Sequence, residues 1–555
     1  MKQIDIIKTY AQKHCLVIDD MPDTRTSVKR ILIDYGVVNI ETVGHAEEAI
    51  ELCQKHQFDM VISDYNLGTG KNGQQLLEEL RYQGLLRNVA IFVLITAETN
   101  THQVLHTLEF MPDDYMSKPV SRASLRPRLD QALLRNMALL PVKEALDQRN
   151  PQKAITACQD VINKNDKYQN DARKMMGTLC ISEKMYDQAD TIFHDTSPTH
   201  RPIWANLGLA RVMYERRQFN SAEDALLKIT KEHPYCIEAM DLLAKLYERT
   251  YKLQQAQTTL NNAIKISPNS PPRQRELGRV SLDLGHDELA VSAYKKAIKN
   301  SRNSYHESAG DYVNLAQGLN KLALKSNQEN NQKLRIEALE ILKIVDKKYG
   351  KHPIATMRSK LVEADIYSLS HNKNKAQECI DTALELHQKL RYSVIANTST
   401  QLCIDCAKAF IDAGEYDAGE HILQELSNLN KDNEFTLKID TLLREPKTPE
   451  GIAYAGGLNK KGILFYTEKD YERALHSFIH VLRAMPNHIG LNLNLIQALI
   501  GKHKIQELNI EEVRILENSF KRIGRIRNSS NHAERYAYLH VRYQKIIEAY
   551  THVNT

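Results

Sequence analysis

The chain has 555 residues, too many for a single hydrophobic core, so we expect more than one domain. Its 74 basic and 69 acidic residues give a net charge of +5, a bias too weak to indicate a nucleic acid or an acidic membrane surface as the partner. We expect a cytoplasmic protein without a membrane anchor, because the sequence contains no apolar signal segment, no apolar run long enough to span a membrane, and no disulfide-type spacing among its eight cysteines.

Four apolar stretches of strand length lie in the first 120 residues, and polar side chains mark the end of each one. The markers are the pair Asp19 and Asp20 after residues 16–18, Asp64 at the end of 60–64, Thr96 after 92–95, and Lys118 after 115–117. Amphipathic helical segments separate the strands, which predicts a doubly wound α/β fold with a parallel sheet. Ligands of such sheets bind beyond the carboxyl ends of the strands, so we expect the markers to meet in one pocket.

These residue types are suited to a site that accepts a phosphoryl group. Asp64 is the candidate nucleophile, and its negative charge would repel the incoming group unless a divalent cation lay beside it. Mg²⁺ prefers oxygen ligands and is usually held by one or two carboxylates together with a phosphate. Lys118 would pair with the phosphoryl oxygens, and the Thr96 hydroxyl would hydrogen-bond one of them. Taken singly, such residues are usually helix caps or turns, but their order and spacing argue against that interpretation.

The arrangement resembles the receiver domain of two-component response regulators, over residues 10–135. The resemblance implies a flavodoxin-like fold, Mg²⁺ as the cofactor, and a sensor histidine kinase or phosphotransfer protein as the phosphoryl donor. It implies metal ligation by the side chains of Asp19, Asp20 and Asp64 and by the backbone carbonyl of Asn66. It makes Asp64 the phosphoacceptor, Thr96 and Tyr115 the switch pair, and Lys118 the lysine that contacts the phosphoryl group. Asn66 and Glu98 match receivers whose phosphoryl group is short-lived.

The loop after Asp64 departs from the family pattern. Gly68 stands where a proline is usual, and Gly73 comes one residue late, so we expect a longer and looser loop. The run from Gly68 to Gly73 superficially suggests a phosphate-binding loop, but its Gly-Lys pair is not followed by Ser or Thr.

Residues 209–290 repeat with a period of 34 residues, and weaker copies of the pattern extend in both directions. Three series keep this period: Leu209, Leu243 and Leu277; Ala210, Ala244 and Gly278; and Ala222, Ala256 and Ala290. The spacing places small side chains where two antiparallel helices approach most closely. The pattern resembles the tetratricopeptide repeat, which implies an all-α superhelix with a protein-binding groove. We expect a linker at 136–148 and the repeats, with a terminal helical cap, at 149–555.

One row of basic residues in the repeats has two interpretations. Arg211, Lys245 and Arg279 share one position of three consecutive units, on the side that faces the groove in this repeat family, with Trp204 and Tyr214 nearby. The row is either a solvated stripe with Trp204 packed in the core, or a basic strip that receives an acidic peptide. The sequence leaves both interpretations open.

We therefore expect a response regulator in which phosphorylation of Asp64 switches the binding of an unidentified protein partner by the repeat groove. The alternative is a transcription regulator that binds DNA through part of the helical array, and the near-neutral charge argues against it. An enzyme, for example a phosphatase within the repeats, is a further alternative, but the repeats offer no constellation of catalytic residues. A signalling adaptor is the expectation.

Overall fold

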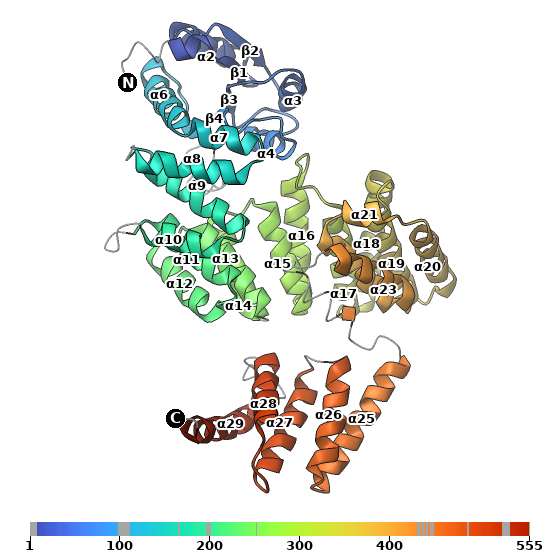
Figure 1. The fold of residues 1–555 in the computed structure, drawn as a ribbon. Helices are drawn as coiled ribbons and strands as arrows, with labels where there is room; N and C mark the ends of the chain where they lie inside the picture. Colours follow the sequence, from blue (N-terminus) through green and yellow to red (C-terminus); the bar gives the residue numbers. More distant parts are fainter. Residues whose placement is uncertain are drawn as a thin grey trace. The chain divides into compact units, whose positions relative to one another are not determined.

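The computed structural model describes residues 8–97, 112–164, 167–195, 201–250, 252–429, 449–485, 488–523 and 533–553, together with positions 435, 439, 442 and 443. The chain divides into two compact units, Met1–Gly318 and Leu319–Thr555. The first unit contains an α/β domain followed by helical hairpins, and the second is helical (Figure 1). Within the described residues, no helix is both long enough and apolar enough to cross a membrane.

The α/β domain contains a five-stranded parallel sheet in the order β2-β1-β3-β4-β5. The strands are β1 (His14–Ile18), β2 (Asn39–Val43), β3 (Met60–Asp64), β4 (Ile91–Thr96) and β5 (Asp114–Ser117). The helices of this domain are α2 (Pro22–Asp34), α3 (Ala46–Lys55), α4 (Gly73–Tyr82) and α6 (Arg122–Ala138). The predicted doubly wound, flavodoxin-like fold is confirmed.

Helices cover both faces of the sheet, because successive strand residues point to opposite sides. Cys15 and Val17 of β1 pack with buried residues of α2 and α6. Leu16 and Ile18 pack with α3 and α4 on the other face. Strands β3 and β4 are buried along their whole length, which explains why they read as continuous apolar runs. The parallel arrangement brings the carboxyl ends of β1, β3 and β4 to one edge.

Five helical hairpins follow the α/β domain in the first unit. They are α7 (Leu140–Asp147) with α8 (Pro151–Asn163), α9 (Gln169–Ser182) with α10 (Tyr186–His194), α11 (Ile203–Glu215) with α12 (Phe219–Glu232), α13 (Ile237–Arg249) with α14 (Leu253–Ile266), and α15 (Pro271–Asp283) with α16 (Asp287–Ser301). The predicted linker, residues 136–148, consists largely of the end of α6 and of α7.

The helix α17 (Ala309–Leu324) spans the boundary between the units, and further helices follow it. These are α18 (Gln328–Tyr349), α19 (Pro353–Leu369), α20 (Lys373–Gln388), α21 (Tyr392–Ala396), α22 (Thr400–Asp412), α23 (Tyr416–Leu429), α25 (Pro449–Thr467), α26 (Tyr471–Ala484), α27 (Ile489–His503), α28 (Ile510–Ile523) and α29 (Ala533–Val553).

Small residues let the two helices of a hairpin approach closely. A Cβ atom added to Gly278 of α15 would lie 2.7 Å from the Tyr294 ring of α16. At Gly462 of α25 it would lie 2.6 Å from the Phe478 ring of α26. Both rings are almost completely buried, so a larger residue would displace them. The tetratricopeptide-type packing predicted from the 34-residue period is confirmed.

The turns inside several hairpins share one backbone device. Arg149, Lys184, Arg217, His371 and Lys469 each follow a first helix with a left-handed φ between 53° and 62°. The N–H group of Arg217, for example, donates to the Tyr214 carbonyl at 3.0 Å. A left-handed residue at this place ends the helix and satisfies its last carbonyl groups. The repeat is therefore visible in the backbone as well as in the sequence.

Candidate functional site

The sheet brings three acidic side chains to one edge. Asp19 and Asp20 directly follow β1, and Asp64 is the last residue of β3. These strands are neighbours, and Ile18 pairs with Ser63 at their carboxyl ends. One carboxylate oxygen from each of the three acids lies within 4.8 Å of the others. The strand order therefore concentrates negative charge at the point where ligands of doubly wound sheets bind.

Lys118 lies between two of these carboxylates. Its Nζ atom donates to Asp64 Oδ2 at 2.8 Å and to Asp19 Oδ2 at 2.9 Å. The residue follows β5, and its N–H group donates to the Thr96 carbonyl at 2.7 Å, which fixes the start of the side chain beside β4. The Lys118–Pro119 peptide bond is cis. The ammonium group compensates part of the negative charge of the cluster.

Burial couples the charges of Asp64 and Lys118. Asp64 is only 6% exposed, and burial raises the pKa of its carboxyl group, against the opposing effect of Lys118. Burial acts to lower the pKa of Lys118, but its hydrogen bonds to Asp64 and Asp19 outweigh this effect and raise the pKa. Lys118 therefore favours the charged form of Asp64.

Backbone N–H groups orient the acids. Tyr65 N–H donates to Asp64 Oδ1 at 2.9 Å, which directs the other oxygen of Asp64 toward Lys118. Met21 N–H donates to Asp19 Oδ1 at 2.9 Å in the same way. Asp20 is half-buried. These hydrogen bonds hold the carboxylates in place without using the oxygens that Lys118 contacts.

The donor set is suited to Mg²⁺, because the cluster offers only carboxylate oxygens, close enough together for one small cation. Asp19, Asp20 and Asp64 would hold the ion. The backbone carbonyl of Asn66, the remaining predicted ligand, belongs to an exposed loop residue just beyond β3. A bound Mg²⁺ would offset the repulsion between the carboxylates and an incoming phosphoryl group.

The other predicted residues lie around this cluster. Thr96 is 2% exposed at the carboxyl end of β4, where its neighbour Ile95 pairs with Asp64. Tyr115 of β5 is half-buried and packs against the core on the side of α3 and α4. Asn66 accepts a hydrogen bond from Gly68 N–H at 3.2 Å through its side chain. Glu98 lies outside the described residues.

The loop after Asp64 is not a phosphate cradle. Lys71, its basic residue, lies 3.6 Å from a carboxylate oxygen of Glu47 and 3.6 Å from one of Glu79. Gly70 has a left-handed φ of 104°, which favours glycine. Lys71 therefore ties the loop to α3 and α4.

The basic row of the repeats is not uniform. Arg279 of α15 forms ion pairs with Glu248, Glu276 and Asp283, so one positive charge faces three negative ones. Arg211 of α11 is half-buried and Lys245 of α13 is exposed. An acidic ligand would have to compete with three carboxylates at Arg279.

The two aromatic residues predicted near this row belong to packed regions. Trp204 is half-buried against the core of the first hairpins, and its ring contacts the edge of Phe193 with centroids 6.2 Å apart. Tyr214 is 5% exposed, and the guanidinium group of Arg249 lies 5.2 Å from its ring centroid. Trp204 therefore packs as the solvated-stripe interpretation requires.

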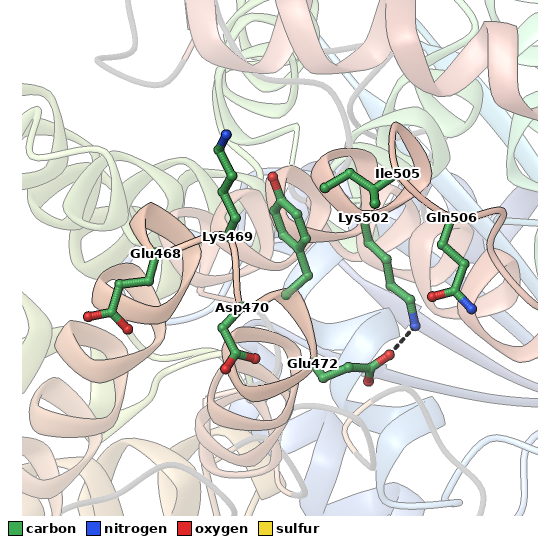
Figure 2. A pocket seen from close by; sticks show the side chains of 8 residues that line it. Glu468, Lys469, Asp470, Glu472, Lys502, Ile505 and Gln506 are labelled. Atoms are coloured by element: carbon green, nitrogen blue, oxygen red, sulfur yellow. Dashed lines mark hydrogen bonds and ion pairs between the residues drawn. The ribbon is translucent and has the colours of Figure 1, made fainter.

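A hollow of 440 Å³ lies in the second unit, and none of the predicted residues lines it. Its lining residues are Glu468, Lys469, Asp470, Tyr471, Glu472, Lys502, Ile505 and Gln506 (Figure 2). Lys502 donates to Glu472, as Figure 2 shows, and to Glu512 at 2.7 Å. These two carboxylates compensate the lysine, so the hollow offers no uncompensated charge at this position.

Reasoning from the sequence missed a contact between the α/β domain and the repeats. Helix α4 contacts residues 300–306, more than 200 positions later in the chain, through hydrogen bonds, a histidine–carboxylate contact and a ring stack. The residues of α4 that make these contacts read as an ordinary polar helix face. No local signal could have identified them, because the contact depends on how the two domains dock.

Known proteins resemble the chain in two regions. Residues 15–130 match the response regulator receiver domain family, and residues 238–270 match a tetratricopeptide repeat. The chain is 30% identical over 116 residues to the chemotaxis protein CheY-3 of Vibrio cholerae, a match that covers 21% of this chain and 88% of that protein. It is 34% identical over 131 residues to the aerobic respiration control protein ArcA of Escherichia coli, covering 24% of this chain and 52% of that protein. The solved structure of the chemotaxis response regulator CheY4 of Vibrio cholerae aligns with a TM-score of 0.21 and 26% identity, over 22% of this chain and 98% of that one.

Proposed function

Because the chain belongs to the response-regulator family through its receiver domain and carries tetratricopeptide repeats behind it, we propose that phosphorylation of Asp64 switches protein binding by the repeats. A sensor histidine kinase or a phosphotransfer protein would donate the phosphoryl group. The repeats would be the output, because stacked helical hairpins present an extended surface for another protein.

The position of Asp64 is the observation that carries this proposal. Its carboxylate lies at the acidic edge of the sheet with the Lys118 ammonium group 2.8 Å away. In the transfer, an Asp64 oxygen bonds to phosphorus as the bond between phosphorus and the donor imidazole nitrogen breaks, and that nitrogen keeps the electron pair. Lys118 would then pair with the phosphoryl oxygens, and the Thr96 hydroxyl would donate a hydrogen bond to one of them.

The switch would begin with this change of partners. Phosphorylation replaces the single negative charge of the carboxylate by a phosphoryl group with a charge of about −1.5 to −2 and three acceptor oxygens. Lys118, now bound by Asp19 and Asp64, would redistribute its hydrogen bonds toward the new group. Thr96 and Tyr115, on adjacent strands, would follow it. A local change of charge becomes a binding signal when a two-state element responds to it.

The first test is phosphorylation by acetyl phosphate with Mg²⁺, followed by intact-mass analysis. We expect one added phosphoryl group on the wild type and none on Asp64→Asn. Asp59→Asn is the matched control, because Asp59 directly precedes the amino end of the same strand, where its carboxylate lies 3.3 Å from the Arg87 guanidinium group. Full labelling of the Asp64→Asn variant would refute the assignment.

The second test concerns the output. Affinity capture with the full chain, with and without acetyl phosphate, should retain a different set of proteins when Asp64 is phosphorylated. The Asp64→Asn variant should retain the same set under both conditions. An identical set for phosphorylated and unphosphorylated wild type would contradict the switch.

A further inference from the structure

The receiver contacts a loop of its own repeat array through helix α4. This segment, residues 300–306, comprises the last two residues of α16 and most of the loop that leads to α17. Gln75 donates through Nε2 to the carbonyl oxygens of Asn300 and Arg302, both at 3.4 Å. These distances are at the long end of the range for hydrogen bonds, so the two bonds are weak.

Two further side-chain pairs complete the contact. His306 Nε2 lies 3.2 Å from Glu78 Oε2, and the Glu78 side chain is only 5% exposed. The Tyr82 and Tyr305 rings stack with centroids 4.8 Å apart. We call this set the α4–loop contact: Gln75, Glu78 and Tyr82 on α4, with residues 300–306 on the repeat side.

Helix α4 begins directly against the phosphoacceptor. A Cβ atom at Gly73, its first residue, would lie 2.1 Å from the Asp64 carbonyl oxygen. Gly73 N–H donates to the Tyr65 carbonyl at 2.8 Å. The backbone of Asp64 and the start of α4 are in close contact, so displacement of one requires displacement of the other.

Gln75 belongs to both ends of this connection. Its Oε1 atom accepts from Asn72 N–H at 3.0 Å, and its own N–H group donates to Asn72 Oδ1 at 2.8 Å, which caps the helix. Its Nε2 atom reaches the repeat loop. One side chain therefore joins the loop after Asp64 to residues 300–302.

A second contact holds the receiver to the repeats at the other end of the sheet. Asp147 of α7 accepts from Asn88 N–H at 2.7 Å, from Asn88 Nδ2 at 2.8 Å and from Val89 N–H at 3.4 Å. Asn88 and Val89 precede β4, at the edge opposite Asp64. This Asp147 contact is far from the phosphoacceptor and more strongly hydrogen-bonded than the α4–loop contact.

We propose that phosphorylation of Asp64 opens the α4–loop contact while the Asp147 contact stays closed, so that residues 300–306 become accessible on the repeats. The inference rests on the proposed function, since it needs a phosphoryl group on Asp64. The reason is mechanical. Asp64, Gly73 and Gln75 are tightly connected, whereas the α4–loop contact depends on two weak hydrogen bonds, one histidine–carboxylate contact and one exposed ring stack. A movement of Asp64 therefore displaces α4 and breaks the α4–loop contact first.

Hydrogen–deuterium exchange of the full chain tests this directly. Acetyl phosphate with Mg²⁺ should raise the exchange rates of residues 73–82 and 300–308 several-fold, while the peptide around Asp147 stays unchanged. The Asp64→Asn variant should show no response. Intact-mass analysis of the same samples separates the two hypotheses: phosphorylated protein with unchanged exchange in both segments overturns the inference alone, whereas protein that is not phosphorylated on Asp64 overturns the proposed function and the inference with it.

Variants of the contact give a second, independent measurement. Tyr305→Ala combined with His306→Ala should show raised exchange of residues 73–82 without phosphodonor, and Glu78→Gln, which keeps the side-chain volume, should do the same to a smaller extent. Because coupling between two sites is reciprocal in free energy, these variants should also reach a higher level of phosphorylation than wild type at limiting acetyl phosphate. Glu79→Gln is the matched control, since the neighbouring Glu79 pairs with Lys71 inside the receiver. Wild-type levels of phosphorylation in correctly folded contact variants would overturn the coupling.

Discussion

The receiver pocket and the repeat array use charge in opposite ways. In the pocket, Lys118 is shared by Asp19 and Asp64, and all three side chains meet at one point. In the repeats, ion pairs are distributed along successive hairpins. Arg273 binds both carboxylate oxygens of Asp241 at 2.8 Å, joining α15 to α13. A concentrated cluster can support chemistry, whereas a distributed one positions neighbouring helices.

This difference determines how each region responds to substitution. Removing one charge from the pocket leaves its partners buried and uncompensated, so phosphorylation of Asp64 should be almost completely lost. Removing one charge from the repeats changes one of many contacts, so the affinity for a partner should decrease only in part.

The largest effect is expected for Lys118→Met. Without the ammonium group, the pKa of Asp64 should rise further, because burial and Asp19 then act on it without the opposing lysine. A protonated carboxyl group is a poor nucleophile, and the phosphoryl oxygens also lose a partner. We expect phosphorylation by acetyl phosphate at neutral pH to slow by about 100-fold or more.

The pH profile and a matched control sharpen this prediction. Deprotonation of Asp64 favours transfer, so the residual activity of Lys118→Met should increase as the pH rises, over a higher range than in wild type. Lys71→Met removes a lysine that pairs with Glu47 and Glu79 outside the cluster, and it should phosphorylate at a rate near that of wild type. Equal losses in the two variants would mean that Lys118 has no special role.

A moderate effect is expected for Gly73→Ala. The added methyl group would lie 2.1 Å from the Asp64 carbonyl oxygen, a backbone atom that cannot rotate away. Overpacking of this kind costs about 1–3 kcal/mol. Native-state hydrogen exchange should show a lower free energy of opening in β3 and α4.

Gly457→Ala in α25 is the control for this substitution. No neighbouring atom lies within 4 Å of a Cβ at this position, so alanine should stabilise the helix by about 0.5–1 kcal/mol. We therefore expect Gly73→Ala to lower the stability and Gly457→Ala to raise it. Unchanged stability of β3 and α4 in Gly73→Ala would remove the mechanical link between Asp64 and α4.

Local sequence patterns predicted the site of the receiver and the packing of the hairpins. Asp64 ends a buried strand and Lys118 directly follows another strand, and parallel strands end at a common edge, so local patterns were enough to bring them together. The small residues of the hairpins were equally visible, because the 34-residue period repeats them. Features that depend on local spacing and strand order were therefore predictable.

Contacts between distant segments were not predictable in this way. Gln75 and Arg302 lie 227 positions apart, and only the docking of two domains brings them together. The case of Arg279 is intermediate. Glu276 and Asp283, three residues before and four after it, were visible as helical partners, but Glu248 belongs to the preceding hairpin.

The smallest effect is expected in the repeat groove, at Arg211 and Lys245. Arg279 is best left out of a charge-reversal test, because its three acidic partners make that position negative and would be disturbed by the change. Replacing Arg211 and Lys245 by glutamate changes the local charge from +2 to −2. Exposed charge contacts are worth about 1 kcal/mol or less each, so calorimetry should show roughly a tenfold weaker complex with a partner captured by the wild type.

The control reverses Lys228 and Lys231, two exposed lysines on α12, the second helix of the hairpin that carries Arg211. Both double variants have the same net charge, so only the position of the change differs. Salt should weaken the wild-type complex too, since exposed charges are screened beyond about 8 Å at physiological ionic strength. Equal weakening by both variants would mean that the partner senses overall charge, and unchanged binding in both would make the row a solvated stripe. Selective loss in the Arg211 and Lys245 variant would place an acidic partner in the groove and show that this region recognises by many small contributions.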